Sequence, residues 1–350
     1  MAEHSIEPEG STYMQNAGSP QLRESGSDHL IGRGVHALRE ASEAGLMANP
    51  KVARASEILT GFSGMKLTGT LQRLTSLFAE DPAACYLEVG VFQGLTLHSV
   101  AVANPSVPCY GIDNFSTNDP EKKNLSIVEE RKRALENDNV HLINQDYEDA
   151  LESLDVGNRK IAVYFVDGPH DYRSQLMCLE LALPYLHDGA FIIVDDSNYK
   201  HVRQANRDFL AIHPDFKLLF EAYSPRHPEQ MTEAERIRAY KGWWNGVNVL
   251  CRDPNDILSR EYPPTDRDRY QFELDHLVHA HGDAKAVAGA LALYHGIRRV
   301  SPKSLAKGLV GLIQMPKTWT KDDRVFEVMN TESKHLPDER INAPFQRYRE

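Results

Sequence analysis

The chain of 350 residues has a net charge of −11, and 41% of its residues are hydrophobic and 25% charged. This length accommodates one large domain with extensions or two modest domains, and the composition is ordinary for a globular protein. The acidic balance argues against nucleic acid as a partner, because binding to phosphates depends on a cationic surface. No segment approaches the roughly 18 consecutive apolar residues of a membrane-spanning helix, so we expect no membrane partner.

The beginning of the chain and its cysteines indicate the cellular compartment. The first 30 residues lack the charged and then apolar pattern of a secretory signal. Cys85, Cys109, Cys178 and Cys251 are widely spaced, which is typical of buried, reduced thiols rather than of a disulfide framework or a zinc site. We therefore expect a cytoplasmic protein.

The chain divides into three predicted parts. Residues 1–50 are rich in Gly, Ser, Glu and Pro without clear periodicity, which predicts a largely disordered or loosely helical leader. Residues 51–252 begin with two helical segments and then alternate strands with helices, which predicts the main domain. Residues 253–350 contain two further helical stretches and predict a helical C-terminal extension, which is also a plausible interface for self-association.

Short apolar strands and amphipathic helices alternate through the main domain. Seven strands are predicted, at residues 85–89, 109–112, 140–144, 161–166, 191–194, 218–222 and 246–251. Helices separate the first five, which indicates an α/β fold with a parallel sheet covered on both faces. The segment between the last two strands shows no obvious crossover helix, so we expect these strands to form an antiparallel pair at the sheet edge.

The first predicted strand ends in a glycine turn, Glu88-Val89-Gly90-Val91-Phe92-Gln93-Gly94. Gly90 and Gly94 permit a tight turn and the close approach of a ligand to the backbone. Their spacing differs from the G-x-G-x-x-G dinucleotide fingerprint. An acid before the turn would repel a pyrophosphate but suits the cationic sulfonium and amino groups of S-adenosylmethionine. The alternative is an ordinary strand-to-helix loop.

Acids also follow the next two strands. Asp113 is placed to accept hydrogen bonds from both hydroxyls of a ribose, and Asp146 to meet an adenine amino group. Each acid has an alternative role as the N-cap of the following helix, since Asp is a preferred capping residue.

In order and spacing, these strand ends resemble the motifs of the class I S-adenosylmethionine-dependent methyltransferases over roughly residues 60–252. The resemblance implies a Rossmann-like, seven-stranded, mostly parallel sheet with an antiparallel edge strand and with helical extensions at both termini. It also implies a set of residues that bind the cofactor: Glu88, Gly90, Phe92, Gly94, Asp113, Asp146 and Asp167.

Three acids at the ends of the fourth and fifth strands predict a metal site. Asp167 follows the fourth strand, and Asp195 and Asp196 follow the fifth, its expected neighbour. Converging carboxylates are costly unless they are protonated or bind a cation, and Mg²⁺ prefers such oxygen ligands. The pattern resembles the metal-dependent O-methyltransferases, and most closely those that act on macrocin-type and aminocoumarin sugars. The alternative is that Asp195 and Asp196 cap a helix while Asp167 only contacts the cofactor.

A possible general base lies next to these acids. His170 lies three residues beyond Asp167, where the metal-dependent relatives carry a catalytic group, and its ordinary pKa suits a base at neutral pH. Asp171 is the second choice. The alternative for His170 is a hydrogen bond within its loop.

The sequence as a whole predicts O-methylation of a small hydroxylated metabolite, such as a sugar or a glycosylated natural product. Two alternatives stay open, a non-catalytic S-adenosylmethionine-binding module and a nicotinamide-dependent oxidoreductase. A separate cluster, His276, His279 and His281, resembles a zinc site in its spacing but lacks further ligands, which favours a solvated helix face.

Overall fold

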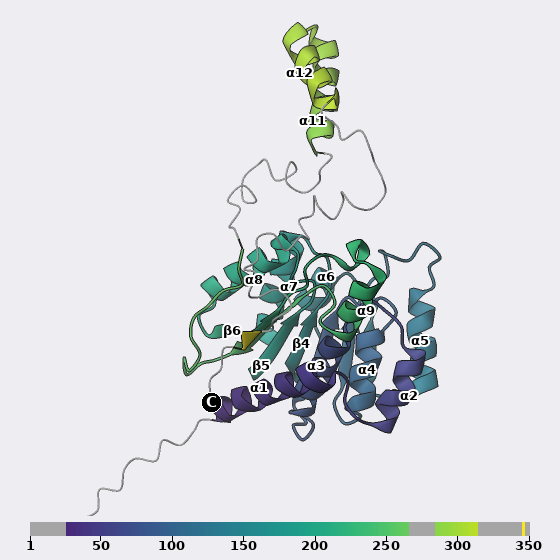
Figure 1. The fold of residues 1–350 in the computed structure, drawn as a ribbon, viewed down its shortest axis with the longest axis vertical. Coiled ribbons are helices and arrows are strands. Elements are labelled where there is room, and N and C mark those ends of the chain that lie inside the picture. The colour runs from purple at the N-terminus through teal and green to yellow at the C-terminus, as the bar shows by residue number, and fades with distance from the viewer. Residues whose placement is uncertain (1–25, 266–283, 314–344, 347–350) are drawn as a thin grey trace, which may run out of the picture.

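The computed structural model describes residues 26–265, 284–313 and 345–346, and in this part of the chain one mixed β-sheet forms the centre of the main domain (Figure 1). The strand order is β3-β2-β1-β4-β5-β7-β6-β8. The strands are β1 (Ala84–Val89), β2 (Cys109–Ile112), β3 (Val140–Ile143), β4 (Lys160–Val166), β5 (Leu186–Val194), β6 (Phe216–Ala222), β7 (Val247–Arg252) and β8 (Phe345–Gln346).

The central strands are parallel and buried on both faces. β1, β2, β3, β4 and β5 pair in parallel, and every residue of β1 and β2 is buried. Side chains alternate between the two faces of the sheet, so that Tyr86 belongs to one apolar core and Leu87 to the other. All seven predicted strands are present, with ends shifted by a few residues.

Helices cover both faces of the sheet (Figure 1). The core on one face includes residues of α1 (Gly26–Ala44), α3 (Met65–Ser76), α4 (Leu95–Ala103) and α5 (Asn124–Leu135). The core on the other face includes residues of α6 (Tyr147–Glu152), α7 (Tyr172–Ala182) and α8 (Lys200–Ile212). α2 (Pro50–Ile58) packs against α4 in a smaller apolar cluster. This is the α/β, Rossmann-like architecture predicted from the sequence.

The far edge of the sheet is more elaborate than predicted. β7 is antiparallel to both of its neighbours and lies between β5 and β6, while the two-residue β8 pairs with β6 at the edge. The predicted antiparallel pairing of the last two strands is present, but their connection also contains the 3₁₀ turn η2 (Pro228–Gln230) and helix α9 (Glu233–Lys241), which were not predicted. Thr232 and Glu235 form a capping box at the start of α9, a signal that is visible in the sequence.

The second half of the predicted leader is helical, which was one of the two expectations, but it is packed on the domain rather than loose. Residues 26–44 form α1, and Ile31, Val35, Leu38 and Ala41 on one side of this helix are buried. These residues recur at helical spacing, so their burial against the sheet and α3 stabilises a segment whose Gly and Ser content suggested disorder. Residues 1–25 lie outside the described residues.

The C-terminal extension contains two helices in its described part. α11 (Ala284–Arg299) and α12 (Pro302–Ile313) pack closely, and a Cβ at Gly308 would lie 2.5 Å from the Leu293 side chain. The histidines at 276, 279 and 281 lie outside the described residues. Within the described ranges, no helix combines the length and the apolar character needed to cross a membrane. The four cysteines are free and buried, as predicted.

If α1 belongs to the folded domain, Leu38→Ala will lower the free energy of unfolding by about 2–5 kcal/mol, because it leaves a cavity beneath the helix. Ile212→Ala, which truncates a side chain that is 60% exposed, is the control and is expected to change it by less than about 0.5 kcal/mol. Chemical denaturation of the full chain measures both. Equal, small effects would show that α1 does not contribute to the core.

Candidate functional site

The carboxyl ends of β1, β4 and β5 lie side by side and carry the predicted site residues. Val89 pairs with Val166, and Val166 pairs with Val194, so the three strands end at one level. Gly90, Asp167 and Asp195 are the residues that follow these ends. Ligands of open parallel sheets bind at this edge, which makes it the candidate active site.

The glycine turn after β1 depends on its two glycines. Gly90 has φ of +91°, and a Cβ there would lie 1.9 Å from the carbonyl oxygen of Asp167. Gly94 has φ of +76° and forms the N-cap of α4. A side chain at Gly90 would therefore separate the ends of β1 and β4, which hold the turn against Asp167.

Glu88 is buried beneath this turn. The hydroxyl of Tyr86 donates to its Oε2 at 2.6 Å, and the hydroxyl of Thr96 donates to its Oε1 at 3.2 Å. Burial raises the pKa of Glu88 to about 8, so the group is mostly protonated at neutral pH. The structure thus gives Glu88 a role in bracing β1 on α4, and its predicted contact with a cofactor stays a prediction.

Asp113 and Asp146 are held by backbone amides. Asp113 accepts hydrogen bonds from the N–H groups of Val91 and Phe92 at 2.9 and 2.8 Å, which ties the end of β2 to the glycine turn. Asp146 is the N-cap of α6 and accepts from the N–H of Glu148 at 3.0 Å. The capping role predicted as an alternative is therefore real for Asp146, and both carboxylates lie at the edge where a nucleotide would bind.

Asp167, His170 and Asp196 converge at the centre of the edge. His170 Nε2 lies 2.8 Å from Asp196 Oδ2 and 3.8 Å from Asp167 Oδ1. The ligand atoms of the three side chains all lie within 4.8 Å of one another, and each side chain is partly exposed to solvent. The chain therefore brings two carboxylates and an imidazole to one point, which is a donor set suited to a metal ion.

The charges in this cluster are strongly coupled. Burial raises the pKa of Asp167 to about 7, and the neighbouring Asp196 adds to this rise. Burial alone would raise the pKa of Asp196 and lower that of His170, but their mutual attraction lowers the first and raises the second well above its ordinary value. In this arrangement, a protonated His170 is the counterion of Asp196.

Two of the predicted residues lie outside the cluster. Asp195 is buried, and its Oδ1 accepts from the N–H of Asp196 at 2.8 Å. Burial and the neighbouring Asp167 raise the pKa of Asp195 well above its ordinary value. Asp171 is exposed and caps α7 by accepting from the N–H of Ser174 at 3.0 Å, so its side chain is engaged as a cap.

Three residues that were not predicted surround the cluster. Tyr199 follows β5, whereas His227 and Asn245 lie between β6 and β7. Asn245 Nδ2 donates to Asp196 Oδ1 at 2.6 Å, and Asn245 Oδ1 is buried without a hydrogen-bond partner among the described residues. The ring of Tyr199 stacks on His170 with centroids 4.9 Å apart, and His227 contacts the same tyrosine. No local motif marks these residues, because only the chain path from β6 to β7 brings Asn245 and His227 back to β5.

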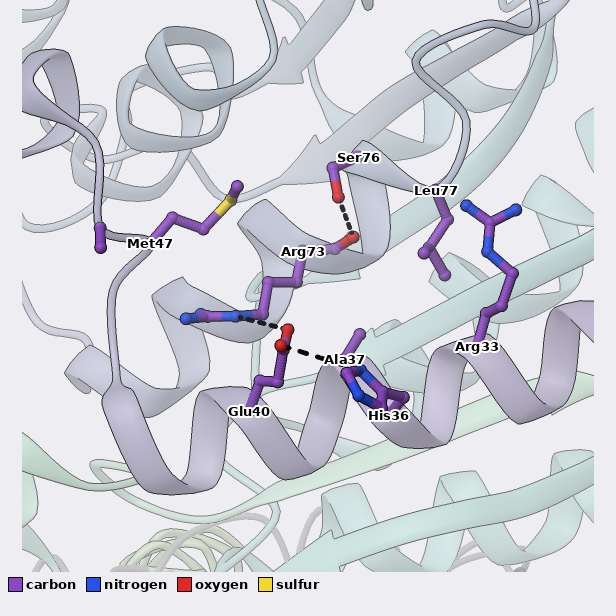
Figure 2. Close-up of a pocket in the computed structure, with 9 residues that line it drawn as sticks. Arg33, His36, Ala37, Glu40, Met47, Arg73, Ser76 and Leu77 are labelled. Atoms are coloured by element: carbon purple, nitrogen blue, oxygen red, sulfur yellow. Dashed lines mark hydrogen bonds and ion pairs between the residues drawn. The ribbon is translucent and has the colours of Figure 1, made fainter.

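A separate cavity of about 320 Å³ lies between α1 and α3 (Figure 2). Glu40 lies between Arg73 and His36 there, and its carboxylate oxygens are 3.5 Å and 3.9 Å from them. Arg73 also donates to the carbonyl of Gly45 at 2.6 Å, so its charge is already compensated. The cavity reaches Ser76, where α3 ends ahead of β1, and is therefore near the opposite end of the strand from the carboxylates.

The fold is similar to those of several solved O-methyltransferases. An O-methyltransferase from Bacillus cereus is 14% identical, with 64% of this chain and 100% of that chain covered and a TM-score of 0.42. TomG from Streptomyces achromogenes, involved in tomaymycin synthesis, is 17% identical, with 62% and 96% covered and a TM-score of 0.43. A putative caffeoyl-CoA O-methyltransferase from Staphylococcus aureus is 13% identical, with 65% and 98% covered and a TM-score of 0.41.

Sequence comparison gives a distant relative and a match to a family model. An uncharacterized protein of Acanthamoeba polyphaga mimivirus is 28% identical over 160 residues, which span 44% of this chain and 69% of that protein. Residues 87–197 match the model of a family described as a methyltransferase domain. The matched segment is therefore similar to a methyltransferase domain. It runs from β1 past the end of β5 and so includes the glycine turn and the Asp167, His170 and Asp196 cluster. The resemblance to the class I methyltransferases is thereby confirmed.

The contact between Gly90 and Asp167 generates a prediction about stability. Gly90→Ala will lower the free energy of unfolding by about 2–4 kcal/mol, because it adds a backbone clash to the strain of a positive φ. Gly157→Ala is the control, since Gly157 also has a positive φ, of +66°, but its Cβ would meet only the Arg159 side chain at 3.7 Å. Thermal and chemical unfolding will compare the two, and equal losses would contradict the close contact between β1 and β4.

The buried Glu88 generates a prediction about pH. Its pKa is raised from 4.5 to about 8, so between these values the folded state binds more protons than the unfolded state, and stability falls as pH rises. Above about pH 8 both states are ionised and the loss from this group is complete. Glu88→Gln removes the group, so between about pH 5 and about pH 8 the variant should lose less stability than the wild type. Denaturation curves at both pH values measure the difference, and parallel losses would refute the assignment.

Proposed function

We propose that the protein transfers the methyl group of S-adenosylmethionine to a hydroxyl oxygen of a small metabolite, with a divalent cation bound at Asp167 and Asp196. The observation that carries this proposal is the convergence of Asp167, His170 and Asp196 within 4.8 Å, beside the glycine turn of a methyltransferase domain. The acids proposed to hold the cation, the proposed base and the glycine turn proposed to contact the cofactor then lie at one edge of the sheet.

The strand ends support a site for the cofactor next to this cluster. Gly90 and Gly94 have positive φ and pack closely on Asp167 and His98, which holds the backbone of the turn at the edge where a ligand would bind. Asp113 and Asp146 follow β2 and β3, and their carboxylates are oriented by backbone amides. A carboxylate fixed in this way can accept hydrogen bonds from ribose hydroxyls or from an adenine amino group without a cost in side-chain ordering.

The residues present fit a hard divalent cation such as Mg²⁺. Asp167 and Asp196 offer oxygen ligands, and the buried Asn245 Oδ1, which lacks a hydrogen-bond partner among the described residues, offers a further oxygen for a bound water. The two carboxylates favour a positive charge beside them, and they raise the pKa of His170 for this reason. When bound, such a cation lowers the pKa of an acceptor hydroxyl and stabilises its oxyanion.

His170 is the group best placed to receive the hydroxyl proton. With a cation held by Asp167 and Asp196, His170 would not be needed as their counterion, and its imidazole could accept the proton. The acceptor oxygen then forms a bond to the methyl carbon as the bond from that carbon to sulfur breaks, and S-adenosylhomocysteine leaves as the neutral thioether. The transfer is an in-line displacement, so the remaining contribution of the protein is to align the reactants.

Substitution of the carboxylates tests the proposal. Asp167→Asn and Asp196→Asn should each lower kcat by at least about 100-fold, because they remove the ligands of the cation. Asp171→Asn retains a capping side chain outside the cluster and is the control, with kcat expected within about twofold of the wild type. Release of S-adenosylhomocysteine from S-adenosylmethionine is measured with a panel of hydroxylated acceptors, in Mg²⁺ and in chelator.

Calorimetric titration with S-adenosylhomocysteine separates the parts of this proposal. Failure to bind would overturn the methyltransferase activity itself. Binding, with full activity in chelator, would overturn the role of the cation. Binding without transfer to any acceptor would favour a non-catalytic S-adenosylmethionine-binding module.

A further inference from the structure

Three aromatic side chains from distant parts of the sequence form a cluster near the candidate site. The ring centroids of Phe62 and Phe92 are 5.3 Å apart, and those of Phe62 and Trp244 are 6.3 Å apart. Phe92 and Trp244 are partly buried, whereas Phe62 is 60% exposed despite both contacts. The three rings therefore offer a contiguous apolar surface to solvent, which we call the aromatic cluster.

The backbone that supports the aromatic cluster is strained. Phe92 has φ of +51° and Trp244 has φ of +52°, a left-handed conformation that bulky residues rarely adopt. Hydrogen bonds maintain it, since the N–H of Phe92 donates to Asp113 and the N–H of Trp244 donates to the carbonyl of Ala239. Strained backbone that the surrounding structure maintains is concentrated at functional sites, where it orients a side chain.

The loop that carries Phe62 is fixed to the segment that carries Trp244. The N–H of Lys66 donates to the carbonyl of Gly242 at 3.0 Å, and a Cβ at Gly64 would lie only 2.2 Å from that oxygen. The absence of a side chain at Gly64 thus allows the two segments to touch. The position of the Phe62 ring is therefore set by backbone contacts as well as by its aromatic neighbours.

Phe92 and Trp244 each connect the aromatic cluster to the candidate site through a neighbouring residue in the chain. Phe92 lies in the glycine turn two residues after Gly90, which packs on the carbonyl of Asp167. Trp244 precedes Asn245, whose amide donates to Asp196. Because β4 lies between β1 and β5, these two attachments lie on either side of Asp167. A molecule that presents a hydroxyl to Asp167 and Asp196 would have the aromatic cluster beside it.

We propose that Phe62, Phe92 and Trp244 bind a planar aromatic group of the methyl acceptor, and that Phe62 determines this specificity. The inference rests on the proposed function and defines its acceptor as a hydroxylated aromatic compound. Stacked or edge-on aromatic pairs are stabilised beyond the burial of their area, and the exposed ring of Phe62 gains most from a partner. A planar aromatic group can lie flat against the rings over its whole face, whereas a sugar ring is puckered and the hydroxyls around its rim need hydrogen-bond partners that three aromatic rings do not provide.

Binding of two matched probes tests the inference. 1,2-Dihydroxybenzene and cis-1,2-cyclohexanediol each carry two neighbouring hydroxyls on a six-membered ring, but only the first is planar and aromatic. Its hydroxyls are also more acidic, so variants of Phe62 separate the effect of the ring from that of the hydroxyls. In calorimetric titrations of the full chain with S-adenosylhomocysteine and Mg²⁺ present, the aromatic probe should bind about tenfold more tightly. Equal affinities, tighter binding of the diol, or no binding of either probe would overturn the proposal.

Three variants assign the preference to Phe62. Phe62→Ala should remove most of the tenfold preference, and Phe62→Tyr, which keeps the ring, should retain it. Ile212→Ala is the matched control, because Ile212 is also 60% exposed but lies at the end of α8, outside the aromatic cluster. In assays of turnover, Phe62→Ala should raise KM for the aromatic acceptor by about tenfold with little change in kcat. An unchanged KM in a variant of unchanged Tm would contradict the inference.

The outcomes separate this inference from the proposed function. If S-adenosylhomocysteine does not bind to the wild type, the proposed function fails and the inference fails with it. If S-adenosylhomocysteine binds and methyl transfer occurs, but sugars or aliphatic diols are preferred, only the inference fails.

Discussion

Carboxyl groups that are buried or half-buried at the ends of neighbouring parallel strands are the constraint on which the site depends. Glu88, Asp167 and Asp195 all have pKa values raised by burial, and only Asp196 has its pKa lowered, through its pairing with His170. A sheet whose faces are covered by apolar cores cannot hold several free negative charges at one edge. Protonation and the imidazolium of His170 resolve this conflict, and a divalent cation would resolve it in another way.

The cost of ionising these carboxyl groups affects both the stability of the fold and the affinity for a cation. A group that is costly to ionise in the folded state lowers stability as the pH rises, but a carboxylate in such surroundings also binds a cation more strongly than it would in water. Asp167 and Asp196 are partly exposed, so an ion and an acceptor can reach them, whereas Glu88 is enclosed by hydroxyl groups and serves the structure. Burial therefore divides similar side chains between two roles.

Segments outside the parallel sheet convert this edge into a defined site. The insertion between β6 and β7 supplies Asn245 to Asp196, and it also supplies Trp244 to the aromatic cluster. The loop before α3 adds Phe62 and is held to the insertion through the carbonyl of Gly242. The acids proposed to hold a cation and the aromatic cluster are thus joined through one short stretch, residues 242–246, as the proposed acceptor with a hydroxyl on an aromatic ring requires.

The sequence by itself determined the seven predicted strands, their alternation with helices, and the acids that follow them, because burial on both faces and strand-end position leave local patterns. It also predicted that Asp167, His170, Asp195 and Asp196 lie at one edge, since residues after neighbouring parallel strands must lie there. The amphipathic spacing of α1 and the capping box of α9 were present in the sequence, but Gly and Ser content and the polar character of the β6–β7 connection obscured them.

Tertiary structure alone decided which acids converge and what surrounds them. Asp195 and Asp196 are adjacent in sequence, yet Asp195 turns to a backbone amide while Asp196, with φ of +53°, faces His170. No local pattern encodes such a difference, because it follows from backbone direction and from Asn245, which lies 49 residues away in the chain. The aromatic cluster likewise exists only because packing brings together three segments whose separation in sequence carries no signal.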